Sequence, residues 1–320
     1  MPFVIDYFFL AGKAGQVRHC FQKQGFIYKG SGNSTEQMKS KNIYLKDLGE
    51  LLRKKALLQQ DGAAHFHVVS DFDRTLTTAF IDGKKFLSSY SLIREGKYLI
   101  ADYPARAHAL FDKYHPYEID ETLSAEKRNK KMNQWWSEHF ELMKECGMNK
   151  AVIKDIVLQR KVQFRAGALE FMDLLSQHKV PLLIFSAGVG DIIKELLLLE
   201  GKLAPNVHLL SNFYLFDEQG LVIGKKNTNF IHTFNKNEVE VKKTPCYNEI
   251  KQRKNVLLLG DSLGDLGMNE GLEHETIIRI GFLNEDKEKM LEKYMQEFDV
   301  VITDDGGMGW VQEMVKDIID

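Results

Sequence analysis

The chain has 320 residues, a hydrophobic fraction of 44% and a formal net charge of −2. This length leaves room for roughly two domains, and the apolar content is sufficient for a full hydrophobic core. The near-neutral charge argues against a protein that binds nucleic acid polymers, which need a basic surface. No apolar run approaches the length of a membrane span, so we expect no membrane partner.

The three cysteines, Cys20, Cys146 and Cys246, are odd in number and widely spaced. Such spacing is typical of reduced thiols in an intracellular protein and not of a disulfide framework or a zinc site. The apolar N-terminal stretch Phe3–Ala11 is short, contains Asp6 and lacks the basic residues of a signal peptide. We therefore expect a cytoplasmic protein, and we expect it to be a monomer.

The first part of the chain, residues 1–45, matches no pattern that we can place, and we treat it as an N-terminal extension of unknown role. Within it, Gly30–Ser40 is rich in Gly, Ser, Asn and Lys, which indicates a linker. The next stretch, Asn42–Leu58, carries leucines at helical spacing from Leu45 to Leu57, and we expect a helix there.

Short apolar runs then recur along the chain, with runs of helical character between several of them, such as Asp191–Glu200 and Asn284–Gln296. A hairpin is expected over Tyr214–Gly224, turning at Glu218–Gly220. Apolar strands that do not alternate with polar residues indicate a parallel sheet covered on both faces, an α/β fold. The expected strands are Phe66–Ser70, Val180–Phe185, Val207–Leu210, Val256–Leu259, Thr276–Phe282 and Val300–Thr303.

The stretch from residue 82 to residue 163 breaks this pattern, because it is long, charged and mostly helical in character. We expect it to form a second, helical domain inserted into a discontinuous core of residues 46–81 and 164–320. Open α/β sheets bind ligands beyond the carboxyl ends of their strands. A helical domain above those ends can exclude water and add substrate specificity.

The most informative stretch is Val68–Thr77, in which a β-branched apolar run ends in Asp71 and Asp73. In an extended chain, residues two apart share one side of the strand. Two carboxylates held there repel each other unless a cation neutralises them. This arrangement suits a Mg²⁺ site that contains a nucleophile and an acid/base group, although aspartates after a strand also commonly start turns.

Three further stretches favour the chemical interpretation. Leu182–Asp191 is a buried run followed by Ser186 and glycines, and such a turn can offer a hydroxyl and backbone N–H groups to a phosphate. Lys236 can supply a point charge for a phosphate oxygen. Val256–Asp265 is another buried run that ends in two carboxylates.

Each of these residues also has a simpler interpretation. Ser186 can be a plain helix N-cap. Lys236 can be a solvated lysine among several neighbouring lysines, and Asp265 can be a helix-capping or supporting residue. The order of nucleophile, hydroxyl, lysine and acidic pair, with three of the four at strand ends, nevertheless favours a phosphate-processing site.

These motifs resemble those of the haloacid dehalogenase superfamily of phosphohydrolases, and within it the cytosolic 5′-nucleotidase III family. That family includes the pyrimidine 5′-nucleotidases and the 7-methylguanosine-phosphate nucleotidases. The resemblance extends from about Leu51 to the C-terminus. The matching stretches are Ser70–Leu76, Phe185–Asp191, Ser211–Phe213, Phe234–Lys236 and Gly260–Leu266.

The resemblance implies a role for each core residue. Asp71 corresponds to the nucleophile that forms an aspartyl-phosphate intermediate. Asp73 corresponds to the acid/base group that protonates the departing 5′-oxygen and then deprotonates the attacking water. The implied cofactor is Mg²⁺, held by the Asp71 carboxylate, the Asp73 backbone carbonyl and Asp261, with Asp265 contributing directly or through a water.

The same resemblance assigns the phosphoryl oxygens to Ser186, to Lys236 and to N–H groups near Ala187. Among the helices, Glu118 corresponds to a glutamate that contacts the base, and Trp136 to an aromatic residue that packs on it. These two residues can equally be a solvated helix charge and a core aromatic.

The family pattern is not matched at every position. His139 stands where the family has a small hydroxyl residue, and this departure puts the family's substrate preference in doubt.

The leading hypothesis is a Mg²⁺-dependent 5′-nucleotidase that acts on nucleoside monophosphates, either pyrimidine or 7-methylguanosine. A second hypothesis is a small-metabolite phosphatase of the phosphoserine phosphatase type, because the motif arrangement is similar to that branch too. A third is a non-catalytic nucleotide-binding or protein-binding module on an inherited fold.

Overall fold

The computed structural model describes residues 39–40, 42–86, 88–120, 122–236, 241–244, 246–271 and 273–320. The apolar N-terminal stretch, Cys20 and most of the linker-like Gly30–Ser40 lie outside these residues. Among the described cysteines, Cys146 and Cys246 are buried free thiols, as their spacing predicts. No helix of the described residues is long and apolar enough to cross a membrane.

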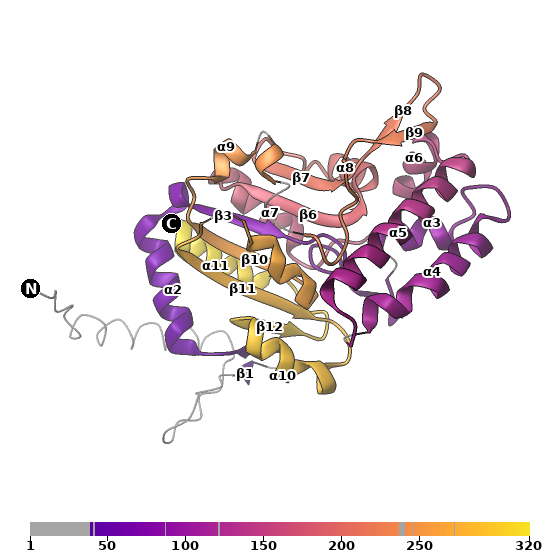
Figure 1. Cartoon of the computed structure of the whole chain (residues 1–320). Helices are drawn as coiled ribbons and strands as arrows, with labels where there is room; N and C mark the ends of the chain where they lie inside the picture. Colours follow the sequence, from indigo (N-terminus) through magenta and orange to yellow (C-terminus); the bar gives the residue numbers. More distant parts are fainter. Residues whose placement is uncertain are drawn as a thin grey trace, which may run out of the picture.

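A mostly parallel sheet forms the centre of the molecule (Figure 1). Two strands at one edge of this sheet pair antiparallel, and the remaining strands pair in parallel. The α/β fold class predicted from the sequence is confirmed. In spatial order the strands are β1 (Lys39–Ser40), β2 (Ile43–Leu45), β12 (Val300–Thr303), β11 (Thr276–Leu283), β10 (Asn255–Gly260), β3 (Phe66–Ser70), β6 (Leu182–Val189) and β7 (Val207–Asn212).

The sheet edge at β2 corrects the helix expected over Asn42–Leu58. Leu45 is fully buried in a strand and pairs with Val300 of β12. The helix α2 begins only at Leu48, because the Asp47 carboxylate accepts a hydrogen bond from the Glu50 N–H at 2.9 Å and caps it. Leucine spacing alone does not reveal that an open sheet edge is available to residues 43–45.

Side chains of the central strands point alternately into two hydrophobic cores. Val68 and Leu257 join one core, and Val69 and Leu258 join the other. The first core is covered by α2 (Leu48–Asp61), α7 (Ala168–Gln177), α8 (Gly190–Leu199) and α11 (Gly309–Ile319). The second is covered by α9 (Tyr247–Ile250) and α10 (Lys287–Glu297). The sheet is therefore buried on both faces, as its non-alternating apolar strands predict.

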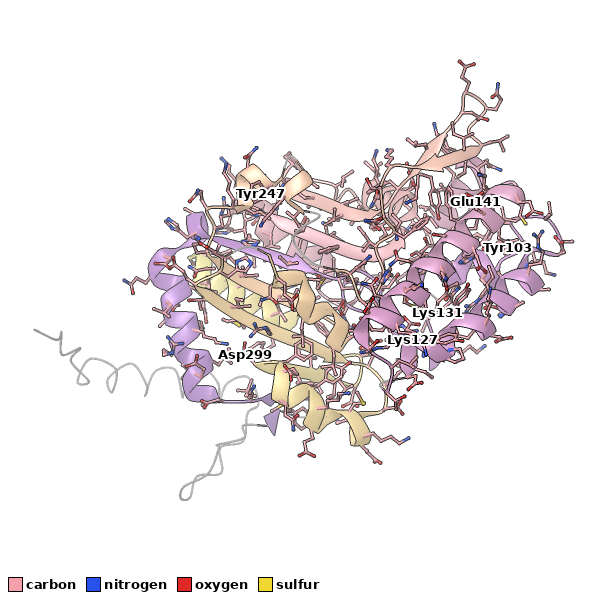
Figure 2. The ribbon with its side chains drawn as sticks, in the orientation of Figure 1. Tyr103, Lys127, Lys131, Glu141, Tyr247 and Asp299 are labelled. Atoms are coloured by element: carbon pink, nitrogen blue, oxygen red, sulfur yellow. The ribbon has the colours of Figure 1, made fainter. Side chains whose placement is uncertain are left out.

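A group of helices lies beyond one end of the sheet (Figure 1). We call it the α3–α6 segment, and it comprises α3 (Ser89–Glu95), α4 (Tyr103–Ile119), α5 (Ala125–Glu145) and α6 (Lys150–Leu158). In Figure 2 the labelled Tyr103, Lys127 and Lys131 lie in this segment, away from Tyr247 and Asp299 on the sheet side of the molecule. The segment is inserted between β3 and β6, which are neighbouring strands of the sheet.

Two short hairpins lie outside the main sheet. One pairs β4 (Phe80–Ile81) with β5 (Lys84–Lys85). The other pairs β8 (Tyr214–Phe216) with β9 (Val222–Lys225), which confirms the hairpin expected over Tyr214–Gly224. Gly220 adopts a φ of +83° in its turn, a conformation that glycine accommodates without strain.

Candidate active site

The expected site residues meet because three neighbouring strands end together. β3 lies between β10 and β6, so Asp71 after β3, Asp261 after β10 and Ser186 near the end of β6 lie at one edge of the sheet. The Asp71 N–H donates to the Leu259 carbonyl at 3.0 Å, which extends the β3–β10 pairing by one residue. The nucleophile candidate is therefore held by a backbone hydrogen bond as well as by the contacts of its own side chain.

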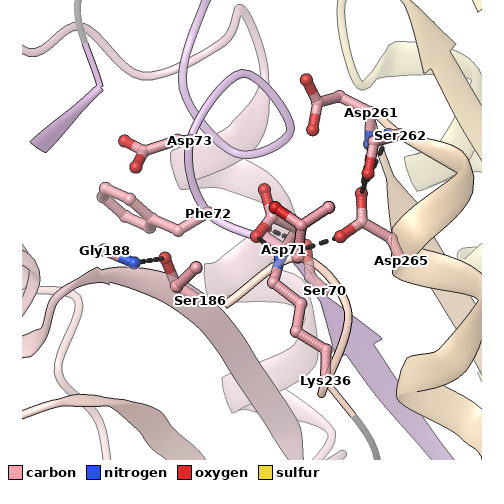
Figure 3. Close-up of polar contacts among 12 residues, drawn as sticks. Ser70, Asp71, Phe72, Asp73, Ser186, Gly188, Lys236, Asp261, Ser262 and Asp265 are labelled. Carbon is pink, nitrogen blue, oxygen red and sulfur yellow. Dashed lines mark hydrogen bonds and ion pairs between the residues drawn. The ribbon is translucent and has the colours of Figure 1, made fainter. Parts of the chain in front are cut away.

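Lys236 joins this group from the loop that follows β9. Its Nζ lies 2.5 Å from Oδ1 of Asp71 and 2.8 Å from Oδ1 of Asp265. Figure 3 shows these three side chains linked in a row. The Lys236 side chain is only 7% exposed, so the interpretation of Lys236 as a solvated lysine is wrong.

Asp265 is held on its other side by the turn that follows β10. Its Oδ2 accepts hydrogen bonds from the Asp261 N–H at 3.1 Å and from the N–H and hydroxyl of Ser262, each at 2.9 Å. The bond from the Ser262 N–H is one half of a capping box at the start of the short helix η3 (Leu263–Asn269), and in the other half the Ser262 side chain accepts from the Asp265 N–H. Asp265 is thus both a capping residue and an ion-pair partner of Lys236.

Close approach at this turn depends on Gly260. A Cβ atom at this position would lie 2.5 Å from the Cβ of Asp265, so a larger residue has no room. Packing against Asp265, and not a special backbone conformation, is therefore the reason for a glycine at position 260.

Asp71, Asp261 and Asp265 form an acidic cluster in which one carboxylate oxygen of each residue lies within 4.8 Å of the other two. An all-carboxylate set of this kind, with Asp71 and Asp265 buried and Asp261 partly exposed, fits a hard divalent cation, which prefers oxygen ligands. The Tyr294 hydroxyl donates to the Asp261 carbonyl at 2.7 Å and so helps to hold this corner of the cluster. The carboxylate of Asp73 does not belong to the cluster.

Burial and mutual repulsion raise the pKa values of the acidic side chains. Burial, opposed by Lys236 and reinforced by Asp265, raises the pKa of the Asp71 carboxyl to about 7. Burial together with Asp265 and Asp71 raises the pKa of Asp261 well above its usual range. Burial alone would lower the pKa of Lys236, but Asp265 and Asp71 raise it above its ordinary value. The site therefore holds excess negative charge that one lysine only partly offsets.

Asp73 lies beside the acidic cluster and is contacted by a residue that sequence reasoning missed. The Ser89 N–H lies 3.3 Å from Oδ1 of Asp73, and the Ser89 hydroxyl lies 3.3 Å from Oδ2. Burial raises the pKa of Asp73, and the hydrogen bonds from Ser89 oppose this. In the sequence, Ser89 stands before a helical run and indicates only a helix start.

Ser186 is a strand residue, so its interpretation as a plain helix N-cap is wrong. It lies within β6, and the residue that caps α8 is Val189, which makes no side-chain capping bond. The Ser186 hydroxyl accepts a hydrogen bond from the Gly188 N–H at 3.0 Å. The Ala187 carbonyl accepts one from the Asn212 side chain at 2.8 Å, which fixes the turn.

A pocket of about 380 Å³ separates these residues from the α3–α6 segment. Glu118 of α4 lines it and accepts a hydrogen bond from the Thr233 hydroxyl at 2.9 Å. Glu118 also lies 3.2 Å from Nδ1 of His115. It does not extend freely into solvent, because it connects α4 to the loop that carries Lys236.

The aromatic residues of α5 line the same pocket. The Trp136 ring lies against Tyr90, with ring centroids 4.2 Å apart, and both residues line the pocket. His139 is buried, and its Nε2 is hydrogen-bonded to the Tyr103 hydroxyl at 2.8 Å. Burial, reinforced by Arg94, lowers the pKa of His139 to about 4. His139 is therefore a neutral wall residue near pH 7.

Arg165 is a second supporting residue that sequence reasoning missed. It is 2% exposed, and its guanidinium donates to the Thr75 carbonyl at 2.8 Å and to the Asn284 side chain at 3.1 Å. It also donates to the Arg74 carbonyl and pairs with Asp305 at 3.0 Å. Arg165 thus fixes the loop that follows Asp73, where Arg74 has a φ of +63°.

Comparison with known proteins agrees with this geometry. The family model described as pyrimidine 5′-nucleotidase (UMPH-1) matches residues 74–319. A Xenopus laevis relative named 7-methylguanosine phosphate-specific 5′-nucleotidase A is 36% identical over 264 residues, which cover 82% of this chain and 91% of the relative.

Solved structures show the same relationship. Cytosolic 5′-nucleotidase IIIB bound to cytidine superposes with a TM-score of 0.81 and 31% identity, covering 88% of this chain and 94% of that one. A HAD-family hydrolase from Salmonella enterica, at a TM-score of 0.50 and 15% identity over 84% of this chain and 80% of its own, shares the fold alone. The haloacid dehalogenase-like fold is thus confirmed, and the chain belongs to the pyrimidine 5′-nucleotidase family, a family of phosphoric monoester hydrolases.

Proposed function

We propose that this protein is a Mg²⁺-dependent 5′-nucleotidase that hydrolyses nucleoside 5′-monophosphates to nucleoside and phosphate. The observation that carries the proposal is the buried row of Asp71, Lys236 and Asp265, with Asp261 completing an acidic cluster at the floor of a pocket. A carboxylate nucleophile, a phosphate-binding cation and a place for a metal are the parts that phosphoryl transfer requires.

The reaction has two steps. In the first, an Asp71 oxygen attacks phosphorus, the bond from phosphorus to the 5′-oxygen breaks, and Asp73 gives its proton to that oxygen. In the second, water attacks the aspartyl-phosphate, its proton passes to Asp73, and the bond to Asp71 breaks. Because burial raises the pKa of Asp73, its protonated form persists to higher pH than for an exposed aspartate.

Lys236, the Ser186 hydroxyl and the N–H groups near Ala187 bind the phosphoryl oxygens and offset their charge. Asp71, Asp261 and Asp265, with the Asp73 carbonyl, would hold the Mg²⁺. The donor set fits this ion, because it consists of oxygen atoms with more negative charge than Lys236 can offset. When bound, the cation supplies further neutralisation of the phosphoryl charge.

The base binds on the opposite side of the pocket, against the α3–α6 segment. Glu118 offers acceptor oxygens to base N–H groups, and Trp136 and His139 form an aromatic wall. The buried indole N–H of Trp136 makes no hydrogen bond within the described part of the chain. Pyrimidine and 7-methylguanosine monophosphates are the candidate substrates, since the relatives are named for these bases and the cytosolic structure holds cytidine.

In domain terms, residues 82–163 cover the site and residues 46–81 with 164–320 form the catalytic core. Residues 1–45 carry no role in this proposal. We place the activity in the cytoplasm, in keeping with the name of the cytosolic 5′-nucleotidase that superposes on this chain.

The test is a set of initial rates with CMP, UMP, GMP and 7-methylguanosine monophosphate at saturating Mg²⁺. We expect phosphate release from at least one of the candidate nucleotides and loss of release in Asp71→Asn, since an amide cannot form the aspartyl-phosphate. Far-UV circular dichroism of the variant checks that it folds. Wild-type turnover by a folded Asp71→Asn variant, or rapid hydrolysis of phosphoserine with none of any nucleotide, would overturn the proposal.

A further inference from the structure

Ser89 is a buried serine that contacts the carboxylate of Asp73 and is not part of the mechanism above. It is the first residue of α3 and only 1% exposed. Its N–H lies 3.3 Å from Oδ1 of Asp73 and its hydroxyl lies 3.3 Å from Oδ2. One residue of the α3–α6 segment therefore reaches both oxygens of a residue in the core loop after β3.

The direction of the Ser89 hydroxyl is set by a second hydrogen bond. The Val189 N–H, at the end of β6, donates to the Ser89 oxygen at 3.2 Å. Since that oxygen accepts from Val189, its hydrogen is left to point at Asp73. The hydroxyl therefore bridges β6 and the Asp73 carboxylate in one orientation.

The contact depends on unusually close packing at Gly188. A Cβ atom at this glycine would lie 2.3 Å from Ser89 Oγ and 3.3 Å from Oδ2 of Asp73. It would also lie 3.1 Å from Ser186 Oγ, the hydroxyl proposed to bind phosphate. Three parts of the chain thus meet at one point, and only a glycine leaves room for the serine bridge.

We propose that Ser89 is a positioning residue, which holds the Asp73 carboxylate in the orientation needed for proton transfer to the leaving oxygen. The proposal rests on the function proposed above, in which Asp73 is the acid/base group. Because Ser89 belongs to α3, the acid/base group is held in place only while α3 packs against β6. The packing of α3 over the substrate and the orientation of the Asp73 carboxylate for proton transfer are thereby linked through the Ser89 hydroxyl.

This role makes the effect of Ser89 depend on the leaving group. A nucleoside 5′-oxygen needs a proton as it departs, whereas p-nitrophenolate departs readily without one. Ser89→Ala should therefore lower kcat for the best nucleotide about tenfold, the effect of one lost buried hydrogen bond, with KM changed less than twofold. The burst of p-nitrophenol from p-nitrophenyl phosphate, which reports the first step alone, should fall far less.

The experiment compares Ser89→Ala with Ser89→Thr, which keeps the hydroxyl, and with Ser211→Ala. Ser211 is 2% exposed and donates its hydroxyl to the Gly188 carbonyl at 2.9 Å, so it matches Ser89 in burial but serves the backbone of the same turn. We expect the loss of activity to depend on the leaving group only in Ser89→Ala, even if both alanine variants lose similar stability. Equal losses of nucleotide turnover and of the p-nitrophenol burst rate in Ser89→Ala would overturn the proposal.

A double-mutant cycle keeps the test decisive if the added methyl of Ser89→Thr does not fit. If Ser89 acts through Asp73, Ser89→Ala should change the p-nitrophenol burst and nucleotide turnover of Asp73→Asn less than twofold. A further tenfold loss in that background would show a general structural role and reject the positioning role. If the wild-type protein hydrolysed no phosphate ester, the proposed function would fail first. If the wild type were active and Ser89→Ala matched it, only this inference would fail.

Discussion

The two sides of the pocket are built in different ways. On the strand-end side, Asp71, Lys236 and Asp265 are linked by charged hydrogen bonds, and backbone groups at the ends of β3 and β10 hold them further. On the helical side, Trp135 and Trp136 stack with nearly parallel rings, and Tyr90 packs against Trp136 at a tilt. The first side fixes a few atoms by directional bonds, whereas the second presents a surface.

This difference suits two different tasks. Phosphoryl transfer requires reacting atoms at defined distances, and rigid strand ends provide them. Recognition of a flat base requires area and a few hydrogen-bonding groups, which helices with aromatic side chains provide. Changes on the strand-end side should therefore affect every phosphate ester, and changes on the helical side should affect nucleotides most.

The largest expected effect is at Lys236. Lys236→Met should lower kcat about 10³-fold for nucleotides and for p-nitrophenyl phosphate alike, because both lose the same charge on the phosphoryl group. Steady-state rates measure it, with Lys226→Met as the control, since Lys226 is an exposed lysine nearby in the chain. A loss confined to nucleotides would contradict the division between the two sides.

The next effect is on stability at acid pH and concerns the helical side. Burial lowers the pKa of His139 from 6.5 to about 4, so the unfolded protein binds a proton at this residue more readily than the folded protein. The contribution of neutral His139 to the free energy of unfolding is therefore fully present above pH 6.5 and is lost as the pH falls through 4. At pH 4.5 the loss is roughly 2.5 kcal/mol, from the linkage of proton binding to unfolding.

Urea unfolding at pH 7.5 and 4.5 measures this loss. His139→Gln, which keeps a partner for the Tyr103 hydroxyl, should show a smaller difference between the two pH values than the wild type. An unchanged difference would mean that His139 is not held neutral in the folded protein.

Cation binding should stabilise the strand-end side. Mg²⁺ at 100 times its dissociation constant would add about 2.7 kcal/mol to the free energy of unfolding and raise the melting temperature by several degrees. Asp261→Asn should remove most of this shift, because it takes one carboxylate from the acidic cluster. Differential scanning fluorimetry with and without EDTA measures it, and Glu288→Gln, an exposed change on α10, is the control. A full shift in Asp261→Asn would place the cation elsewhere.

The smallest expected effect is at Glu118. Glu118→Gln keeps an acceptor for Thr233 but loses the charge, and this should raise KM for nucleotides about tenfold. The rate with p-nitrophenyl phosphate should fall much less, since that ester has no base. Parallel KM measurements on CMP and the aryl phosphate test this prediction. Equal effects on both esters would mean that Glu118 acts on the phosphate and not on the base.

The strands and their motifs were predictable because each carries a local signal. The runs that became β3 and β12 end where the sequence places them, since an apolar stretch followed by turn residues needs no further information. Residues 43–45 were assigned wrongly, because their leucine spacing continues that of α2 and only an open sheet edge makes them a strand.

Ser89 and Arg165 show what single-residue signals leave out. A serine before a helical run and an arginine after a charged stretch are ordinary in any sequence. Their importance comes from partners distant in the chain, such as Asn284, which lies 119 residues from Arg165. Burial is what turns their hydrogen bonds into constraints on the Asp73 loop, since a buried donor must find an acceptor.

The sequence by itself determined the α/β fold and the residue types of a phosphohydrolase, because hydrophobic period and strand-end motifs are local properties of the chain. Only the tertiary structure decided that Lys236 lies between Asp71 and Asp265, that Ser186 belongs to a strand and that Ser89 contacts Asp73. These contacts join segments far apart in the chain. They depend on the order of strands in the sheet and on packing at single glycines, which no local pattern encodes.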